Sequence, residues 1–428
     1  MLLSFLLRKC NDRDANTLPQ FEIVYLLFLP FMTSFLFKKE LTIFNSILAL
    51  NALDIPLYEK IPMQALFIGF SAESDAELWE YGYGMLLNFS ICQTLMKIGQ
   101  LKSLDVIDCN LFSIVLTNVL YMIDPELPSL SFQILRGSLI AFFVTVAINY
   151  IISSLLTKMK KNPHIKSLSL FSIFVIVFPI LMDQLIQLES IDERPSMWLL
   201  QYVLGSSARK SILLVWLSFL LILIPNVLIF KSNFSLNTSR KIWHFLILLL
   251  ITMPFQMDPL FVKIALSGTI VLFLSVEYLR FLQLEPFGAY IDSKLRSFAD
   301  FRDDKGPIII SYIYLIIGIS TPLLINDSPV GLISLGVGDS LASIIGGKWG
   351  RYHWPGTRKT IEGTLSFIIG TSIVAYILKY YMEYFADITF SNLLWVCTIS
   401  GILEGNSELN DNILIPTYMM ILEKLLSN

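Results

Sequence analysis

Charged residues are scarce in this sequence. Only 15% of its 428 residues are Asp, Glu, Lys or Arg, whereas soluble domains average about a quarter. The chain is 55% hydrophobic, and its mean hydropathy is +0.67. These values exclude an ordinary soluble domain and favour a protein embedded in a membrane. The formal net charge of −3 gives no reason to expect a nucleic-acid partner.

Several familiar motifs are also missing. The four cysteines are scattered without a C-x-x-C pair, which argues against a disulfide framework or a cysteine metal site. The N-terminal segment "MLLSFLLRKCNDRD" has no basic region before its apolar start and no small-residue cleavage site after it, so a cleaved signal is not predicted. Neither a Walker A loop nor a G-x-G-x-x-G loop occurs.

Apolar runs, by contrast, recur along the whole chain. They cover residues 20–37, 42–57, 61–72, 84–98, 107–123, 133–157, 167–186, 197–207, 210–230, 242–257, 260–282, 307–326, 330–347, 361–381, 389–405 and 411–426. A membrane-spanning helix needs ~20 residues, so the shortest runs are expected to be re-entrant or interfacial. We predict an all-α, polytopic integral membrane protein with roughly thirteen transmembrane helices.

The polar residues divide the chain into two parts. Residues 1–230 contain spans with few polar interruptions and no chemical motif, so we expect a scaffold or a groove for an apolar substrate. Residues 231–428 have loops rich in Gly, Asp, Lys and Arg, and carboxylates inside apolar stretches. We therefore place the chemistry in the second part, as a catalytic membrane domain.

The basic residues of the second part predict its orientation. Loops 231–241, 283–306 and 348–360 are rich in Lys and Arg. The loops expected on the opposite face, "PFQMDP", "INDSP" and "MEYFADI", contain neither residue. The positive-inside rule places the basic loops in the cytosol.

One stretch, "GVGDSLASIIGGKWGRYHWPGTRKTIEG" (336–363), combines a carboxylate, small residues and a basic cluster. In a helix, Asp339, Ala342, Gly346 and Gly350 fall at i, i+3, i+7 and i+11, on one narrow face. Close helix packing through small residues would explain the alanine and glycines. It would not explain Asp339, because a carboxylate at the centre of a membrane helix costs ~2.5–3.5 kcal/mol unless it meets water, a cation or a partner.

The functional interpretation of this stretch is a phosphate site. Glycines let backbone N–H groups approach phosphate oxygens, basic side chains neutralise them, and a helix opening at Thr360 favours an anion. Asp339 would hold Mg²⁺, which takes one or two carboxylates together with phosphate oxygens. The predicted phosphate-binding residues are Gly336, Gly338, Gly346, Lys348, Gly350, Arg358, Lys359 and Thr360.

Two further segments carry polar residues at a span. Glu404, Glu408 and Asp411 lie at i, i+4 and i+7 and would share one face of an unbroken helix, which requires a cation or a polar cavity. The alternative is a solvated loop, "EGNSELNDN". In "SRKIWHF" (239–245), His244 follows Arg240 at i+4, and is either a nucleotide contact or an ordinary polar residue at a helix end.

At this point the residues resemble a known family. The 336–363 stretch is similar to the D-x-x-A-x-x-x-G-x-x-x-G … K-K-T-x-E-G signature shared by dolichol kinases and CDP-diacylglycerol synthases, which both use CTP, although Arg358 stands where the first Lys is usual. "SRKIWHF" resembles the R-K-x-x-H motif of lipid CTP kinases. "FADFRDDKGPIIISYIYLIIGISTP" (298–322) resembles the dolichol kinase segment before the signature, with Tyr312 in place of a usual His.

The C-terminal segment distinguishes these families. "LEGNSELNDNILIP" (403–416) resembles the dolichol kinase ending, with Leu409 where Gln is expected, and the G-H-G-G stretch of the synthases is absent. The positions that match this ending are Glu404, Ser407, Asp411, Asn412 and Pro416. The similarity covers roughly residues 239–428.

The resemblance implies CTP-dependent phosphorylation of dolichol or another polyprenol to the lipid carrier of protein glycosylation, at the endoplasmic reticulum membrane, with the CTP site facing the cytosol. It implies a divalent cation, Mg²⁺, at Asp339. The expected catalytic residues are Asp339, Lys359, Glu362, Glu404 and Asp411, with Asp411 or Glu404 as the candidate base, and the CTP site extends to Arg240, Lys241 and His244.

Three alternatives stay open on the sequence. One is a CDP-diacylglycerol synthase-like cytidylyltransferase, and another is a different CTP-dependent lipid kinase. The third is a membrane transporter, against which the absence of an inverted repeat counts. The sequence does not indicate an oligomeric state.

Overall fold

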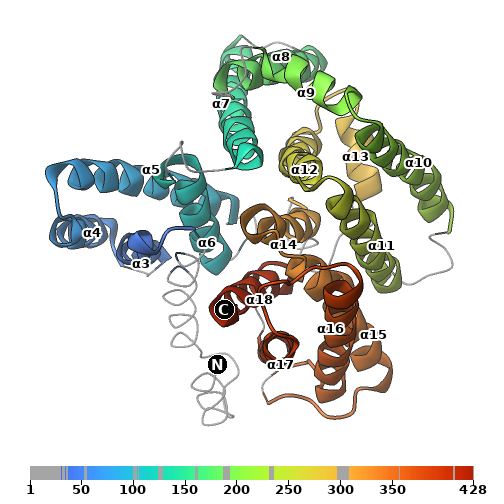
Figure 1. Cartoon of the computed structure of the whole chain (residues 1–428). Coiled ribbons are helices and arrows are strands. Elements are labelled where there is room, and N and C mark those ends of the chain that lie inside the picture. The colour runs from blue at the N-terminus through green and yellow to red at the C-terminus, as the bar shows by residue number, and fades with distance from the viewer. Residues whose placement is uncertain are drawn as a thin grey trace. The chain divides into compact units, whose positions relative to one another are not determined.

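The computed structural model describes residues 30, 34, 37–52, 55–99, 104, 106–123, 129–159, 162–186, 193–230, 236–295, 308–355, 357–407 and 410–427. At 222–230, 236–240, 242 and 243 it describes the backbone alone. Every extended regular element in these ranges is a helix, as Figure 1 shows. One isolated β-bridge, between His353 and Thr360, is the exception. The predicted all-α class is confirmed.

The chain forms two compact units. Unit 1 comprises residues 1–128 and 300–310, and unit 2 comprises 129–299 and 311–428. The boundary predicted at residue 230 divides the chain by the expected roles of its two parts and not by compactness. It stays a prediction.

Unit 1 contains a broken helix. The apolar run expected at 42–57 is divided, because α3 ends at Ala49 and a short turn follows it. Side-chain donors from neighbouring helices satisfy the carbonyls at the break: Gln64 Nε2 donates to Ile47 O at 3.0 Å, Asn110 Nδ2 to Ala49 O at 3.1 Å and Lys60 Nζ to Asn51 O at 3.0 Å. Irregular backbone is tolerated in a membrane protein where protein groups satisfy it in this way.

The helices of unit 1 pack around a small apolar core that includes Phe44, Leu48 and Ile114. They are α3 (Thr42–Ala49), α4 (Leu57–Ser71), α5 (Asp75–Gly99) and α6 (Val106–Thr117), with short helical turns at Lys39–Leu41 and Leu50–Ala52 and a π-helical turn at Asn118–Met122.

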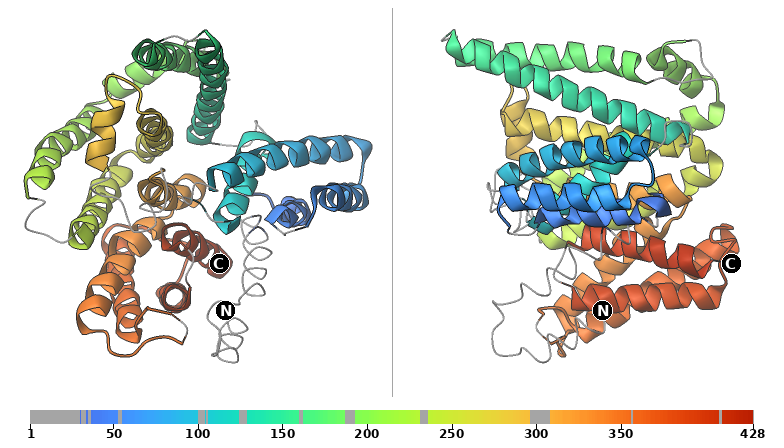
Figure 2. Two further views of the ribbon diagram at one scale, coloured as in Figure 1. Left: turned by 180° about the vertical axis from the view of Figure 1, so that it is seen from behind. Right: turned by 90° about the vertical axis from the view of Figure 1, so that its left-hand side faces the viewer.

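Unit 2 contains most of the described helices, which Figure 2 shows from two further sides. They are α7 (Leu130–Lys158), α8 (Pro163–Leu185), α9 (Pro195–Leu204), α10 (Ser207–Phe230), α11 (Leu236–Met257), α12 (Pro259–Phe281), α13 (Gly288–Leu295), α14 (Ser311–Asn326), α15 (Ser340–Trp349), α16 (Ile361–Tyr381), α17 (Phe390–Asn406) and α18 (Asp411–Leu426). A π-helical segment, η6 (Leu332–Asp339), leads directly into α15.

Four of the described helices are long and apolar enough to cross a membrane: α7, α8, α12 and α16. The pair α9 and α10 passes the same test together but bends by 95°, as a broken span or a re-entrant segment does. The chain is therefore an all-α, multi-pass membrane protein. The expected count of thirteen spans is not shown by these lengths and stays a prediction.

Two helices that bear on the site begin at capping residues. Thr360 precedes α16, and its hydroxyl accepts a hydrogen bond from Gly363 N at 3.2 Å. Asn410 precedes α18 and accepts from Asn412 N at 3.1 Å. Such side chains satisfy backbone N–H groups that a helix start leaves unpaired. The helix start predicted at Thr360 is confirmed.

A buried ion cluster that the sequence analysis did not single out joins α12, α13 and α14. Arg280, which is 1% exposed, donates from Nε and Nη2 to the two carboxylate oxygens of Glu277, at 2.8 and 2.6 Å. Its Nη1 donates to Asp292, and Tyr312 Oη donates to Glu277 at 2.6 Å. A buried charge needs partners of this kind, so the cluster fixes the junction of the three helices.

Candidate active site

Asp339 lies at the end of the π-helical segment η6, inside unit 2. Its Oδ2 accepts a hydrogen bond from Lys241 Nζ at 2.5 Å and lies 3.5 Å from His244 Nδ1. Both partners project from α11 and are about 5% exposed or less. The carboxylate was expected to meet water, a cation or a partner, and in the structure it meets a lysine of the same chain; the metal expected at Asp339 stays a prediction.

Lys359 lies in the loop between α15 and α16. Its Nζ donates to both carboxylate oxygens of Asp411 at 2.8 Å and to Glu404 O at 2.8 Å, and it lies 3.0 Å from Glu404 Oε1. Burial alone would lower the pKa of Lys359, but the two carboxylates outweigh it and raise that pKa above its usual range. Lys359 is therefore a permanent cation.

Glu404 and Asp411 meet at a helix break. Glu404 lies in the last turn of α17, which ends at Asn406, and Asp411 opens α18, so the two carboxylates do not share one unbroken helix. The expectation that acidic side chains gather here around a cation is confirmed for this pair. Glu408 lies outside the described residues.

The two ion clusters belong to one site. The segment η6, which carries Asp339, packs against α11 and against α18, which carries Asp411, and α18 packs against α17, which carries Glu404. Five segments supply the site: α11, η6, the loop before α16, α17 and α18 (Figure 1). Sequence reasoning selected Lys241 and His244 through the R-K-x-x-H motif but did not pair them with Asp339. The side chain of Arg240 lies outside the described part.

The glycines of the stretch make close helix contacts. A Cβ at Gly346 would lie 2.7 Å from Thr360 Oγ1, and one at Gly350 would lie 2.5 Å from Thr360 Cγ2. A Cβ at Gly338 would meet the Phe367 ring at 2.4 Å, and one at Gly336 would lie 3.1 Å from a backbone oxygen of α11. Packing accounts for these glycines, and their predicted contact with phosphates stays a prediction.

Glu362 organises the loop rather than the ion clusters. Its Oε1 accepts from Arg351 N at 3.0 Å and from Tyr352 N at 3.3 Å. Trp354 Nε1 donates to Thr364 Oγ1 at 2.9 Å, so the indole is tied to α16. The side chains of Lys348, Arg351 and Arg358 are exposed. The loop thus presents its basic groups outward while Lys359 turns inward.

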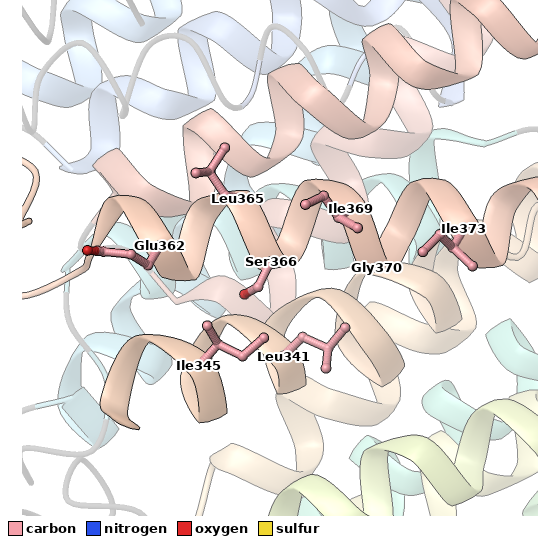
Figure 3. Close-up of a pocket in the computed structure, with 8 residues that line it drawn as sticks. All are labelled: Leu341, Ile345, Glu362, Leu365, Ser366, Ile369, Gly370 and Ile373. Atoms are coloured by element: carbon pink, nitrogen blue, oxygen red, sulfur yellow. The ribbon is translucent and has the colours of Figure 1, made fainter. Parts of the chain in front are cut away.

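A groove of about 380 Å³ runs between α15 and α16 (Figure 3). Its walls are mostly apolar, with Leu341 and Ile345 on one side and Ile369 and Ile373 on the other. Of the predicted site residues, only Glu362 lines it, at one end. The groove is therefore separate from the charged site.

Comparison with known proteins finds a closely similar relative. The dolichol kinase of Saccharomyces cerevisiae is 48% identical over 433 residues, which cover 100% of this chain and 81% of the relative. The chain belongs to the dolichol kinase family.

Other comparisons agree with this membership. A family model described as the dolichol kinase N-terminal domain matches residues 5–124. The dolichol kinases of Schizosaccharomyces pombe and Homo sapiens are 38% and 30% identical, over 45% and 54% of this chain and 40% and 48% of their own lengths. No solved structure matches the chain. The match at 5–124 extends the resemblance into the half that the motifs had left unassigned.

Membership of the dolichol kinase family argues against the synthase and transporter alternatives. It also raises the question of which residues of the site could bind a divalent cation. Among the described residues, no group of three His, Cys, Asp or Glu side chains is close enough to hold a metal ion unaided. Mg²⁺ is usually held by one or two carboxylates, with substrate phosphates and water completing its shell. Asp339 fits that mode as the carboxylate.

Proposed function

We propose that this chain transfers the γ-phosphoryl group of CTP to the terminal hydroxyl of dolichol, giving dolichyl phosphate and CDP. The observation that carries the proposal is the convergence of Asp339, Lys241, Lys359, Glu404 and Asp411 in a chain of the dolichol kinase family. The donor is proposed as CTP because the 336–363 signature resembles that of another CTP-using family.

The site suits phosphoryl transfer, in which the protein supplies alignment and charge rather than covalent chemistry. Mg²⁺ bound at Asp339 would neutralise charge on the phosphates. Lys359, Arg358 and Lys348 supply positive charge from the loop, and His244 lies beside Asp339 to orient its carboxylate. These groups stabilise charge that develops in the transition state.

A carboxylate must also accept the proton of the alcohol. Asp411 and Glu404 both lie on Lys359, but the Asp411 side chain is 25% exposed and the Glu404 side chain 7%. A base has to come within hydrogen-bond reach of the substrate hydroxyl. We therefore assign the base to Asp411, and Glu404 is the second carboxylate that Lys359 meets in the free enzyme.

The membrane placement completes the proposal. The basic loops support a cytosolic CTP site, and the product implies the endoplasmic reticulum membrane. About thirteen spans, with a lipid-binding role for residues 1–230, remain our expectation.

The test uses purified protein, a polyprenol and γ-labelled CTP or ATP in parallel. We expect label to pass to the lipid from CTP in preference to ATP, with CDP as the second product. Release of pyrophosphate would instead indicate a cytidylyltransferase, and equal or better labelling from ATP would remove the support for CTP as donor.

A further inference from the structure

Both lysines of the site are already bound to carboxylates. An ammonium group has three N–H donors, and Lys359 Nζ has four oxygens within 3.0 Å, from Glu404 and Asp411. Lys241 Nζ lies 2.5 Å from Asp339 Oδ2. Lys359 therefore has no donor left for a phosphate while it keeps these contacts.

The carboxylate expected to hold the metal is occupied in the same way. Mg²⁺ binds carboxylate oxygen at about 2.0–2.1 Å and tolerates little distortion of its shell. An ammonium at hydrogen-bond distance from Asp339 Oδ2 takes up a position at that oxygen and repels a second cation near either oxygen of the carboxylate. A metal therefore binds Asp339 against the charge of Lys241.

The charges explain why the lysines are there. Asp339, Glu404 and Asp411 would carry three negative charges in a part of the molecule where their side chains are 17%, 7% and 25% exposed. Such a group of carboxylates is costly to bury without counter-charges. Lys241 and Lys359 supply two positive charges and leave the set with a single net negative charge.

We propose that Lys241 and Lys359 are resident counter-ions that exchange partners when the metal–nucleotide complex binds. In the free enzyme they neutralise the carboxylates. On binding, the divalent cation replaces Lys241 on Asp339, and the freed ammonium groups move to phosphate oxygens. The four-carbon lysine stem allows this movement without a change in the backbone. The inference rests on the proposed function, and it predicts weak binding of metal alone and strong coupling between metal and nucleotide.

The test measures Mn²⁺ binding to the full-length protein by electron paramagnetic resonance in the absence of nucleotide. Lys241→Met removes the competitor from Asp339, so the Kd for Mn²⁺ should fall by about tenfold or more, the usual scale of coupling between two sites. Lys263→Met is the matched control, because Lys263 also pairs with an aspartate, Asp327, outside the site. We expect that control to bind Mn²⁺ as the wild type does.

A second measurement needs no variant. Saturating CTP should lower the Kd of the wild-type protein for Mn²⁺, since phosphates draw the lysines away from the carboxylates. The exchange is overturned if Lys241→Met binds Mn²⁺ no better than wild type. If that variant fails to fold, the proposed exchange is instead overturned by a wild-type Kd for Mn²⁺ that CTP does not change.

The Mn²⁺ measurements and the lipid-labelling assay can fail independently of each other. A wild-type protein that labels dolichol from CTP but shows neither effect on Mn²⁺ refutes the exchange alone. One that shows both effects without labelling dolichol refutes the proposed function alone.

Discussion

Lys359→Met should damage both stability and turnover. Methionine keeps much of the side-chain volume but leaves Glu404 and Asp411 facing each other without their cation. Removing one partner of a fully buried ion pair costs about 3–5 kcal/mol. The side chains of Lys359 and Asp411 are 26% and 25% exposed, so we expect the lower end, about 3 kcal/mol. At about 2 °C per kcal/mol for a large domain, the melting temperature should fall by about 6 °C.

The assay is thermal unfolding in detergent, with kcat and KM for CTP measured on the same preparations. Arg358→Met, at an exposed neighbouring position, is the control for stability and should melt close to wild type. Lys359→Met/Asp411→Asn removes one of the two stranded charges, so it should recover part of the lost stability and remain inactive. A single Lys359→Met variant that melts within about 1 °C of wild type, the range of an ordinary surface substitution, would refute the ion cluster.

Asp339→Asn should lower kcat by orders of magnitude and also lower the melting temperature, because Lys241 would stay buried without its partner; normal kcat in a stable variant would contradict the assignment. Gly405→Ala should destabilise by about 1–3 kcal/mol, since its Cβ would lie 2.3 Å from a threonine oxygen and 2.4 Å from an indole nitrogen. Gly268→Ala, with nothing within 4 Å of the added Cβ, should melt at or above wild type, and equal losses in both would contradict the packing argument. Tyr352→Cys, at a position 70% exposed, should react with an impermeant thiol reagent from the cytosolic side, and labelling from the lumen alone would contradict the orientation.

Local signals in the sequence predicted much of the site. A carboxylate within an apolar run requires a partner, and Asp339 has one. Thr360 before an apolar run marks a helix start, and α16 begins there. The acidic group near residue 404 was expected to need a cation or a polar cavity, and Lys359 is the cation that Glu404 and Asp411 meet. Each of these predictions follows from the high cost of a lone charge or an unpaired backbone group in an apolar environment.

The pairing itself could not be predicted, because it depends on tertiary structure. Lys241 is 98 residues from Asp339 in sequence, and Lys359 is 52 residues from Asp411. Nothing in the sequence indicated that the basic loop turns Lys359 inward, to Glu404 and Asp411, while Lys348, Arg351 and Arg358 are exposed. The break after Ala49 was also missed, since hydropathy does not register side chains that satisfy backbone carbonyls at a break.

The buried cluster around Arg280 has a consequence for how the protein is made. Glu277 and Arg280 lie one turn apart on α12, so this helix can enter the membrane with its acid and base already paired. Asp292 follows 12 residues after Arg280, and Tyr312 comes later in the chain. During synthesis the cluster thus gains Asp292 and then Tyr312, which bonds Glu277, in the order in which they leave the ribosome. Glu277 and Arg280 therefore need not enter the membrane as lone charges.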